Sequence, residues 1–266
     1  MTSFNEDQLR RYSRHIILPE VGGEGQEKLL ASKILLVGMG GLGSPAGLYL
    51  AAAGVGTLGL VDFDEVELSN LQRQILHSTK DLGKRKVESA RETLKGINPD
   101  VTLRNHDEKL TPENIMEIIS DYDLILDGSD NFPTRFLLND ACVLAGKTSV
   151  YGAVFRFEGQ MTVFEPHQGP CLRCFIPEIP PPGSVPRCQE AGILGVLPGV
   201  IGTLQATEAI KIILGIGRPL IGRFLVFDAL EMELSEFKLP KNPKCLVCGE
   251  DAKLVDLKDY GDFCTL

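Results

Sequence analysis

The chain is short of positive charge. Its 266 residues include 27 Lys and Arg against 36 Asp and Glu, which gives a formal net charge of -9 at pH 7. Nonspecific nucleic-acid binding draws its affinity from Lys and Arg that neutralise phosphates, so this balance argues against such a partner. The same deficit argues against docking on an anionic membrane surface. We therefore expect neither nucleic acid nor membrane among the partners.

A long uninterrupted hydrophobic run is also missing. The longest apolar stretch, residues 46–61, falls short of the roughly 20 residues that a membrane-spanning helix needs, and glycines interrupt it. Residues 1–7 carry acidic side chains and no apolar core, unlike a secretory signal peptide. Seven cysteines without an export signal indicate a reducing compartment. We expect a cytoplasmic protein whose thiols bind metals or carry out chemistry.

No histidine-centred triad is evident. The four histidines are His15, His77, His106 and His167, and none lies beside a recognisable nucleophile motif. A Ser–His or Cys–His nucleophile is therefore not expected.

A glycine-rich loop follows the first predicted strand. Residues 33–37 form a short apolar run, the loop Gly38-Met-Gly-Gly-Leu-Gly43 follows it, and residues 45–53 form a helix of small residues. Residues 57–61 form a second predicted strand that ends at Asp62. This βαβ unit predicts the opening of a doubly wound sheet.

Strands and helices continue to alternate along the chain. Residues 148–164 change the pattern and predict two antiparallel strands joined near 156–159. The predicted fold is therefore an α/β, Rossmann-like, doubly wound and mostly parallel sheet extended by antiparallel strands. The other predicted helices are 6–16, 84–95, 112–120, 135–145 and 203–214, and the other predicted strands are 101–104, 124–126 and 224–227.

The glycine loop and Asp62 match a dinucleotide-binding fingerprint. Glycines let the backbone approach a phosphate, and the N-terminus of the next helix supplies N–H donors and a favourable dipole. Asp62 lies at about the distance where an acidic residue binds ribose. Alone, this pattern favours an NAD-type site over other nucleotides, and a purely structural tight turn stays open.

The segment after Asp62 carries more polar groups than a dinucleotide needs. Residues 62–74 follow the carboxyl end of a strand, where open α/β sheets bind ligands. Arg73 and Lys86 add positive charge near the same edge, and a triphosphate under attack needs several such charges. A solvated helix face is the alternative, and it suits Lys84 and Arg85 better than Arg73.

A third polar cluster ends the strand 124–126. Here the run Asp127-Gly-Ser-Asp130-Asn131 precedes Arg135. A carboxylate in this run could hold Mg²⁺, which prefers carboxylate, water and phosphate oxygens. A turn with a helix N-cap is an equally good interpretation of the spacing.

Two Cys-x-x-Cys pairs, Cys171 with Cys174 and Cys245 with Cys248, have the spacing of a four-thiolate zinc site. In a reducing compartment a structural zinc is favoured over redox pairs. Such a site would pin the C-terminal segment to the core. Arg173, inside the first pair, can offset the negative charge of four thiolates.

Taken in order, these motifs resemble those of the MoeB/ThiF/HesA family, the bacterial relatives of ubiquitin-activating enzymes. The resemblance runs from about Leu9 to Cys248 and rests on the ordered set rather than on any one motif. Members adenylate the C-terminal glycine of a small ubiquitin-like sulfur carrier with Mg-ATP and release pyrophosphate. The set comprises Arg11-Tyr-Ser-Arg14, Gly38-x-Gly-Gly-Leu-Gly-Ser44, Asp62-x-Asp64, Ser69-Asn-Leu-Gln-Arg73, Lys86, Asp130-Asn-x-x-x-Arg135 and the two cysteine pairs.

The resemblance implies roles for the matching residues. The glycine loop lies against the nucleotide, and Asp62 binds its ribose. Asn70, Arg73 and Lys86 contact the phosphates. Asp130 positions Mg²⁺. The implied ATP-binding residues are Gly38, Gly40, Gly41, Leu42, Gly43, Asp62, Asp64, Ser69, Asn70, Leu71, Gln72, Arg73, Gln74, Lys86, Asp130, Asn131 and Arg135, and the implied ligands of a structural zinc are Cys171, Cys174, Cys245 and Cys248.

The resemblance also implies partners. Arg14 reaches the active site of a second subunit, so the catalytic unit is a homodimer. The carrier ends in Gly-Gly, and a separate donor such as a cysteine desulfurase or rhodanese supplies sulfur. Molybdopterin, thiamin and other sulfur-transfer routes stay open.

Cys188 lies in the region where relatives pass the carrier's tail toward ATP, here residues 177–191. In some relatives a cysteine at this place becomes covalently linked to the carrier, and in others it is dispensable. Both roles stay open for Cys188. We expect the segment to act as a lid that excludes water from the acyl-adenylate.

We divide the chain into an N-terminal helical arm (1–32), an ATP-binding adenylyltransferase domain with the zinc site (33–250) and a C-terminal tail (251–266). Two alternatives remain. An NAD-dependent oxidoreductase explains the glycine loop but leaves Arg73, Lys86 and the cysteine pairs without a role. A non-catalytic nucleotide-binding scaffold would keep the pocket without the chemistry.

Overall fold

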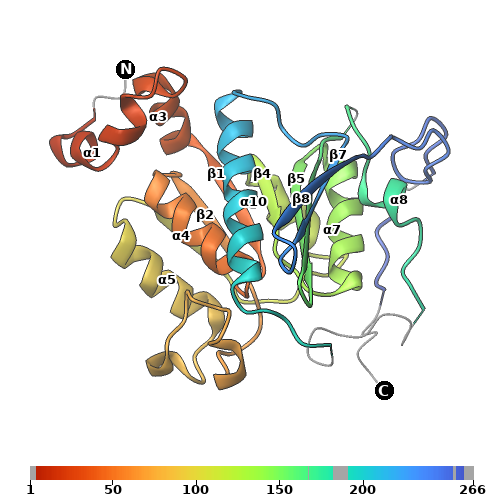
Figure 1. Ribbon diagram of the computed structural model, residues 1–266, viewed down its shortest axis with the longest axis horizontal. Coiled ribbons are helices and arrows are strands. Elements are labelled where there is room, and N and C mark those ends of the chain that lie inside the picture. The colour runs from red at the N-terminus through yellow and green to blue at the C-terminus, as the bar shows by residue number, and fades with distance from the viewer. Residues whose placement is uncertain (1–3, 167, 182–190, 254–255, 261–266) are drawn as a thin grey trace.

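The computed structural model describes residues 4–166, 168–181, 191–253 and 256–260. The strands form one open eight-stranded sheet, and Figure 1 shows helices on both of its faces. The strands are β1 (Lys33–Val37), β2 (Thr57–Val61), β3 (Thr102–His106), β4 (Leu124–Asp127), β5 (Thr148–Phe155), β6 (Glu158–Phe164), β7 (Arg223–Asp228) and β8 (Glu233–Lys238).

The sheet has the order β3-β2-β1-β4-β5-β6-β7-β8. Strands β1 to β5 pair in parallel, and β6, β7 and β8 add to them in antiparallel fashion. The chain moves outward from β1 to β3 and then returns to the other side of β1 at β4. Loops that leave β1 and β4 therefore part at this point, which is where ligands bind in open α/β sheets. The predicted fold class is confirmed.

Helices cover both faces of the sheet. Those on one face include α4, α5 and α10, and those on the other include α6 and α7. Among the described residues the helices are α1 (Glu6–Arg11), α2 (Ser13–Ile16), α3 (Gly22–Ala31), α4 (Gly43–Ala53), α5 (Lys86–Ile97), α6 (Ile115–Ser120), α7 (Phe132–Ala145), α8 (Leu172–Phe175) and α10 (Leu197–Leu214), with short 3-10 turns η1 (Leu68–Asn70) and η2 (Thr79–Asp81).

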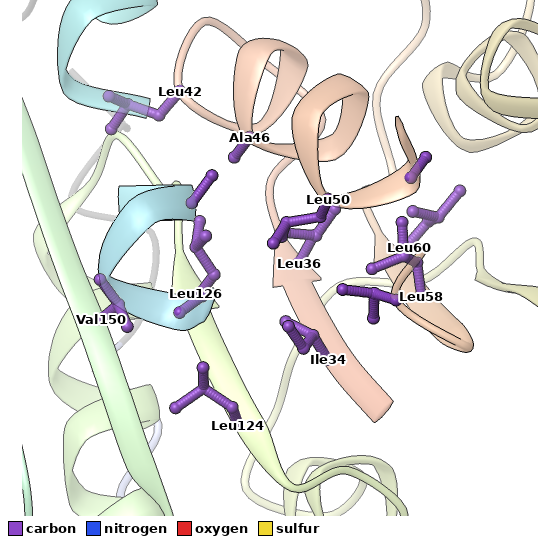
Figure 2. Packing of buried hydrophobic residues seen from close by; sticks show 14 of the residues in the cluster. Ile34, Leu36, Leu42, Ala46, Leu50, Leu58, Leu60, Leu124, Leu126 and Val150 are labelled. Atoms are coloured by element: carbon purple, nitrogen blue, oxygen red, sulfur yellow. The ribbon is translucent and has the colours of Figure 1, made fainter. Parts of the chain in front are cut away.

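The central strands are apolar on both faces because helices cover both. Figure 2 shows Leu36 of β1 beside Leu50 of α4, while Leu126 and Val150 lie next to α10. The alternate residue of β1, Leu35, packs on the other face with the α6 and α7 side chains. This two-sided burial explains why the parallel strands appear in the sequence as continuous apolar runs.

Some boundaries differ from the predicted ones. The helix predicted over 6–16 is interrupted at Tyr12, because this buried side chain turns inward and its hydroxyl accepts a hydrogen bond of 2.9 Å from Asn98 Nδ2. Helix α3 lies within the predicted N-terminal helical arm but was not predicted as a separate helix, since it begins with a Gly-Gly pair of low helix propensity. Strand β8 was also missed, because its charged residues at the sheet edge hide any apolar pattern.

Helix α10 begins at Leu197, earlier than the predicted residue 203, with Pro198 in its first turn. Within the described part of the chain, one helix is long and apolar enough to cross a membrane by length and composition, and it is α10. Half of it is buried, and it packs on the sheet beside α4 (Figure 1). These contacts are those of a core helix.

Gly59 allows β2 to pack closely on its neighbours. A Cβ atom there would lie 2.3 Å from the Tyr122 hydroxyl and 2.6 Å from Leu35 Cδ1, both buried. We expect Gly59→Ala to lower the free energy of unfolding by about 1–3 kcal/mol through overpacking. The matched control is Gly96→Ala in α5, where an added Cβ meets nothing within 4 Å. Equal urea midpoints for the two variants would contradict this packing.

Candidate active site and metal centre

The glycine loop leaves β1 in a conformation that only glycine accommodates well. Gly38 has a φ of +91°, and a Cβ there would lie 2.8 Å from the carbonyl oxygen of Gly128. A Cβ on Gly43 would lie 1.9 Å from the Gly38 carbonyl oxygen. The loop from β1 is thus folded tightly against the chain leaving β4, which brings the first and third polar clusters together.

Asp62 supports the glycine loop from the end of β2. One carboxylate oxygen accepts a 2.8 Å hydrogen bond from the Met39 N–H, and the other accepts one of 2.9 Å from the Asp64 N–H. Only 9% of Asp62 is exposed, and this burial raises its pKa against the opposing effect of Lys86. Each oxygen keeps a further acceptor site, which a ribose hydroxyl could use.

Arg73 lies against the outer side of the loop. Its Cγ is 3.7 Å from where a Cβ on Gly41 would stand, and its guanidinium donates a 3.0 Å hydrogen bond to the Ser69 carbonyl. Asn70 is buried in η1 behind it. Gln74 is also buried, close to Gly40, and its Oε1 has no hydrogen-bond partner among the described residues.

Lys86 is a buried cation at the first turn of α5. It is 6% exposed, and its Nζ lies 2.7 Å from Asp64 Oδ2. The Asp64 side chain is 53% exposed at this edge of the sheet. The ammonium group of Lys86 is therefore paired with the exposed carboxylate of Asp64, and it lies at the same edge of the sheet as the glycine loop.

The polar residues that follow β4 make different local contacts. Asp127 is buried, which raises its pKa, and one of its oxygens accepts bonds from the Ser129 N–H (3.0 Å) and hydroxyl (2.6 Å). Asn131 caps α7 by accepting from the Thr134 N–H, as the N-cap interpretation proposed. Arg135 donates 2.7 Å to the Ser129 carbonyl. Asp130 is exposed at the edge.

The remaining predicted ATP-binding residues lie along the same two segments. Leu42 is buried, Gly40, Gly41 and Leu71 are half-buried, and Ser69 and Gln72 are exposed.

Arg14 does not lie at this edge. It is exposed on α2, whose neighbours Arg11 and Tyr12 bond to Ile97 and Asn98 at the far end of α5. Lys86 begins that helix, about 16 Å away by helix rise. Figure 1 shows the N-terminal helices at the opposite end of the sheet from the loop after β2. Within one chain, Arg14 is therefore separated from Arg73, Lys86 and Asp130. Cys188 lies outside the described residues.

The four predicted metal ligands converge. The sulfur atoms of Cys171, Cys174, Cys245 and Cys248 all lie within 4.8 Å of one another, with 3.7 Å between Cys171 and Cys245 and 3.4 Å between Cys174 and Cys248. Zinc–sulfur bonds of about 2.3 Å in a tetrahedron require sulfurs roughly this far apart. The donor set therefore fits one zinc ion.

A buried ion pair braces the first cysteine loop. Arg173 donates from Nε and Nη2 to the two oxygens of Asp140, each at 2.8 Å, and Tyr260 donates to the same carboxylate at 2.9 Å. Asp140 is fully buried on α7. The guanidinium is therefore tied first to Asp140, which links α7, the cysteine loop and the predicted C-terminal tail.

Sequence reasoning missed two buried polar residues at this edge. Gln205 of α10 donates to the carbonyls of Asp127 (2.8 Å), the last residue of β4, and of Val150 (3.1 Å) in the neighbouring strand β5. His77 lies beneath the glycine loop, 2.9 Å from the Met39 carbonyl oxygen. Neither belongs to a spaced motif, so only their position near the polar segments could have singled them out.

A glycine loop at the point where strand order reverses, with a buried cation and carboxylates around it, defines a nucleotide-binding α/β protein with an added four-cysteine metal centre. The particular family follows from comparison with known proteins. The ThiF family matches residues 12–247, and the chain belongs to it.

Named relatives match nearly the whole chain. The sulfur carrier protein adenylyltransferase of Thermus thermophilus is 49% identical, with 99% of each chain covered. The probable adenylyltransferase/sulfurtransferase MoeZ of Mycobacterium tuberculosis is 48% identical over 99% of this chain and 67% of its own length. Escherichia coli MccB, solved with ATP, has the same fold with a TM-score of 0.75, at 23% identity over 90% of this chain and 74% of its own.

The metal centre can be tested by removing one ligand. We expect the purified protein to hold about one zinc ion per chain, and Cys245→Ser to lose it and to unfold at a lower temperature, because three ligands bind zinc less tightly than four. Metal analysis and thermal unfolding measure both effects. Cys142→Ser is the control, since this buried thiol, whose pKa burial raises, lies outside the cluster. Full zinc in the Cys245 variant would contradict the assignment.

Proposed function

We propose that this adenylyltransferase uses ATP to activate the C-terminal carboxylate of a small ubiquitin-like sulfur-carrier protein and releases pyrophosphate. The convergence of the glycine loop, Arg73 and Lys86 at one sheet edge carries the proposal, because it gathers phosphate-binding groups where a nucleotide would lie. The name of the Thermus thermophilus relative supports the carrier as substrate.

The reaction suits these residues. A carboxylate oxygen of the carrier attacks the α-phosphorus of ATP, the bond to the bridging oxygen breaks, and pyrophosphate leaves with that electron pair. A C-terminal carboxylate is already an anion at neutral pH, so no general base is needed. The site must align two anions that repel each other and stabilise the leaving group.

Each residue of the edge takes one part of this task. The N–H groups of residues 40–42 and the N-terminus of α4 face the phosphates, and Arg73 and Lys86 neutralise charge on them. Asp62 accepts hydrogen bonds from the ribose. Asp130, exposed beside the loop, would hold Mg²⁺, which supplies further positive charge to the leaving pyrophosphate when bound.

The second subunit completes the site in this proposal. Since Arg14 lies at the far end of α5 from Lys86, it can serve catalysis only in another copy of the chain. The structural zinc holds the C-terminal segment. A separate sulfur donor acts after adenylation in the cytoplasm, in a molybdopterin, thiamin or related route. Cys188 stays a candidate for a covalent link to the carrier.

Removal of the Asp130 carboxylate tests the chemistry. We expect Asp130→Ala to lower the rate of carrier adenylation by about 10²–10³, the usual cost of losing one group that stabilises charge in the transition state. Mass spectrometry of the carrier acyl-adenylate measures it. Asp121→Ala is the control, since this exposed carboxylate pairs with Arg104 away from the edge. An unchanged rate for the Asp130 variant would remove this residue from the site.

Mixing inactive variants tests the shared site. Arg14→Ala and Arg73→Ala should each be inactive alone. In a mixed dimer one of the two sites has its own Arg73 and the partner's Arg14, so random pairing should restore about one quarter of the activity. Mixing Arg14→Ala with itself is the control. If the dimers have exchanged subunits and activity does not return, a site built from two chains is contradicted.

A further inference from the structure

His77 is a buried histidine that the proposed chemistry does not use. It is 6% exposed and lies in the segment that follows η1. Both of its ring nitrogens have partners: Nε2 lies 2.9 Å from the Met39 carbonyl oxygen, and Nδ1 lies 2.8 Å from the Ser89 hydroxyl. Ser89 and Met39 are themselves buried, so the whole contact is shielded from water.

These partners determine the tautomer of the ring. A carbonyl oxygen only accepts hydrogen bonds, so Nε2 must carry the proton and donate to Met39. Burial lowers the pKa of His77, which favours the neutral ring. Nδ1 is then the acceptor, and the Ser89 hydroxyl donates to it.

The result is that both backbone polar groups of Met39 are held. The Met39 N–H donates to Asp62, and the Met39 carbonyl accepts from His77. In a trans peptide the carbonyl and the next N–H point in opposite directions. With the Met39 carbonyl directed inward at His77, the Gly40 N–H is directed outward, and it donates no hydrogen bond within the described chain.

The same ring joins the three segments that carry the phosphate-binding residues. It contacts the glycine loop through Met39, and it belongs to the segment that holds Arg73. It contacts α5 through Ser89, one turn after Lys86, and Thr93 of that helix donates 2.9 Å to the carbonyl of Leu76. A change at His77 would therefore shift the loop relative to both cations.

We propose that His77 is a positioning residue: its Nε2–H holds the Met39 carbonyl so that the Gly40 N–H points at a phosphate of the bound nucleotide. This inference rests on the proposed function only in taking ATP as the ligand. The histidine itself touches neither the nucleotide nor the carrier.

A pair of variants separates the donor from the ring. His77→Leu fills the space without a donor, and His77→Gln restores an N–H near the Nε2 position. We expect the leucine variant to bind ATP about tenfold more weakly, which corresponds to about 1.4 kcal/mol, and the glutamine variant to recover most of the loss. The Michaelis constant for ATP should rise in the leucine variant while that for the carrier stays unchanged, which a general loss of structure would not produce.

Calorimetric titration with ATP and urea unfolding of each variant decide the matter. If the wild type binds ATP and the leucine variant binds it with the same affinity, the role of His77 is overturned while the proposed function stands. If the glutamine variant loses as much ATP affinity as the leucine variant, the claim that the N–H donor is what matters is overturned. No ATP binding by the wild type would overturn the proposed function instead. If the leucine variant does not fold, NMR of the wild type replaces it: His77 should stay in the Nε2–H tautomer, and the Gly40 amide signal should move on addition of ATP.

Discussion

The structure depends on a close backbone contact between two loops at the centre of the sheet. Where β1 and β4 part, Gly38 lies so near the Gly128 carbonyl that a Cβ would come within 2.8 Å of it. Parallel pairing of β1 with β4 places their carboxyl ends side by side at one edge, and this contact folds the glycine loop directly against the cluster after β4. The buried apolar core on both faces of β1 makes the contact rigid.

The charges near this contact differ in sign from the net charge of the chain. The protein as a whole carries an excess of acidic residues, yet Arg73 and Lys86 lie at the edge where the loop is open. Buried carboxylates such as Asp62 accept hydrogen bonds from backbone N–H groups and do not face the solvent. The proposed site for phosphates is thus built from oriented N–H groups with a few cations, and the acidic surface elsewhere does not cancel it.

Much of this could be read from the sequence, for reasons that differ by element. Strands β1 and β2 were predicted to the residue because continuous apolar runs bounded by glycine and aspartate have few other interpretations. The cysteine cluster was predicted because Cys-x-x-Cys spacing is specific. The break at Tyr12 and the contact of His77 with Met39 depend on partners distant in the sequence, which no local pattern contains. The edge strand β8 was missed for another reason, because its exposed, charged residues give no apolar pattern. Asn131 shows that one motif can include both a helix cap and candidate ligands.

Exchange of labelled pyrophosphate into ATP tests the central claim most directly. The zinc-loaded protein with Mg²⁺ would be measured alone and with each diglycine-ending carrier from the same cell. The account predicts exchange that one carrier strongly stimulates, because a reversible acyl-adenylate forms only with its carboxylate. Absence of exchange with every carrier, from protein that binds ATP, would contradict adenylation and leave a nucleotide-binding scaffold.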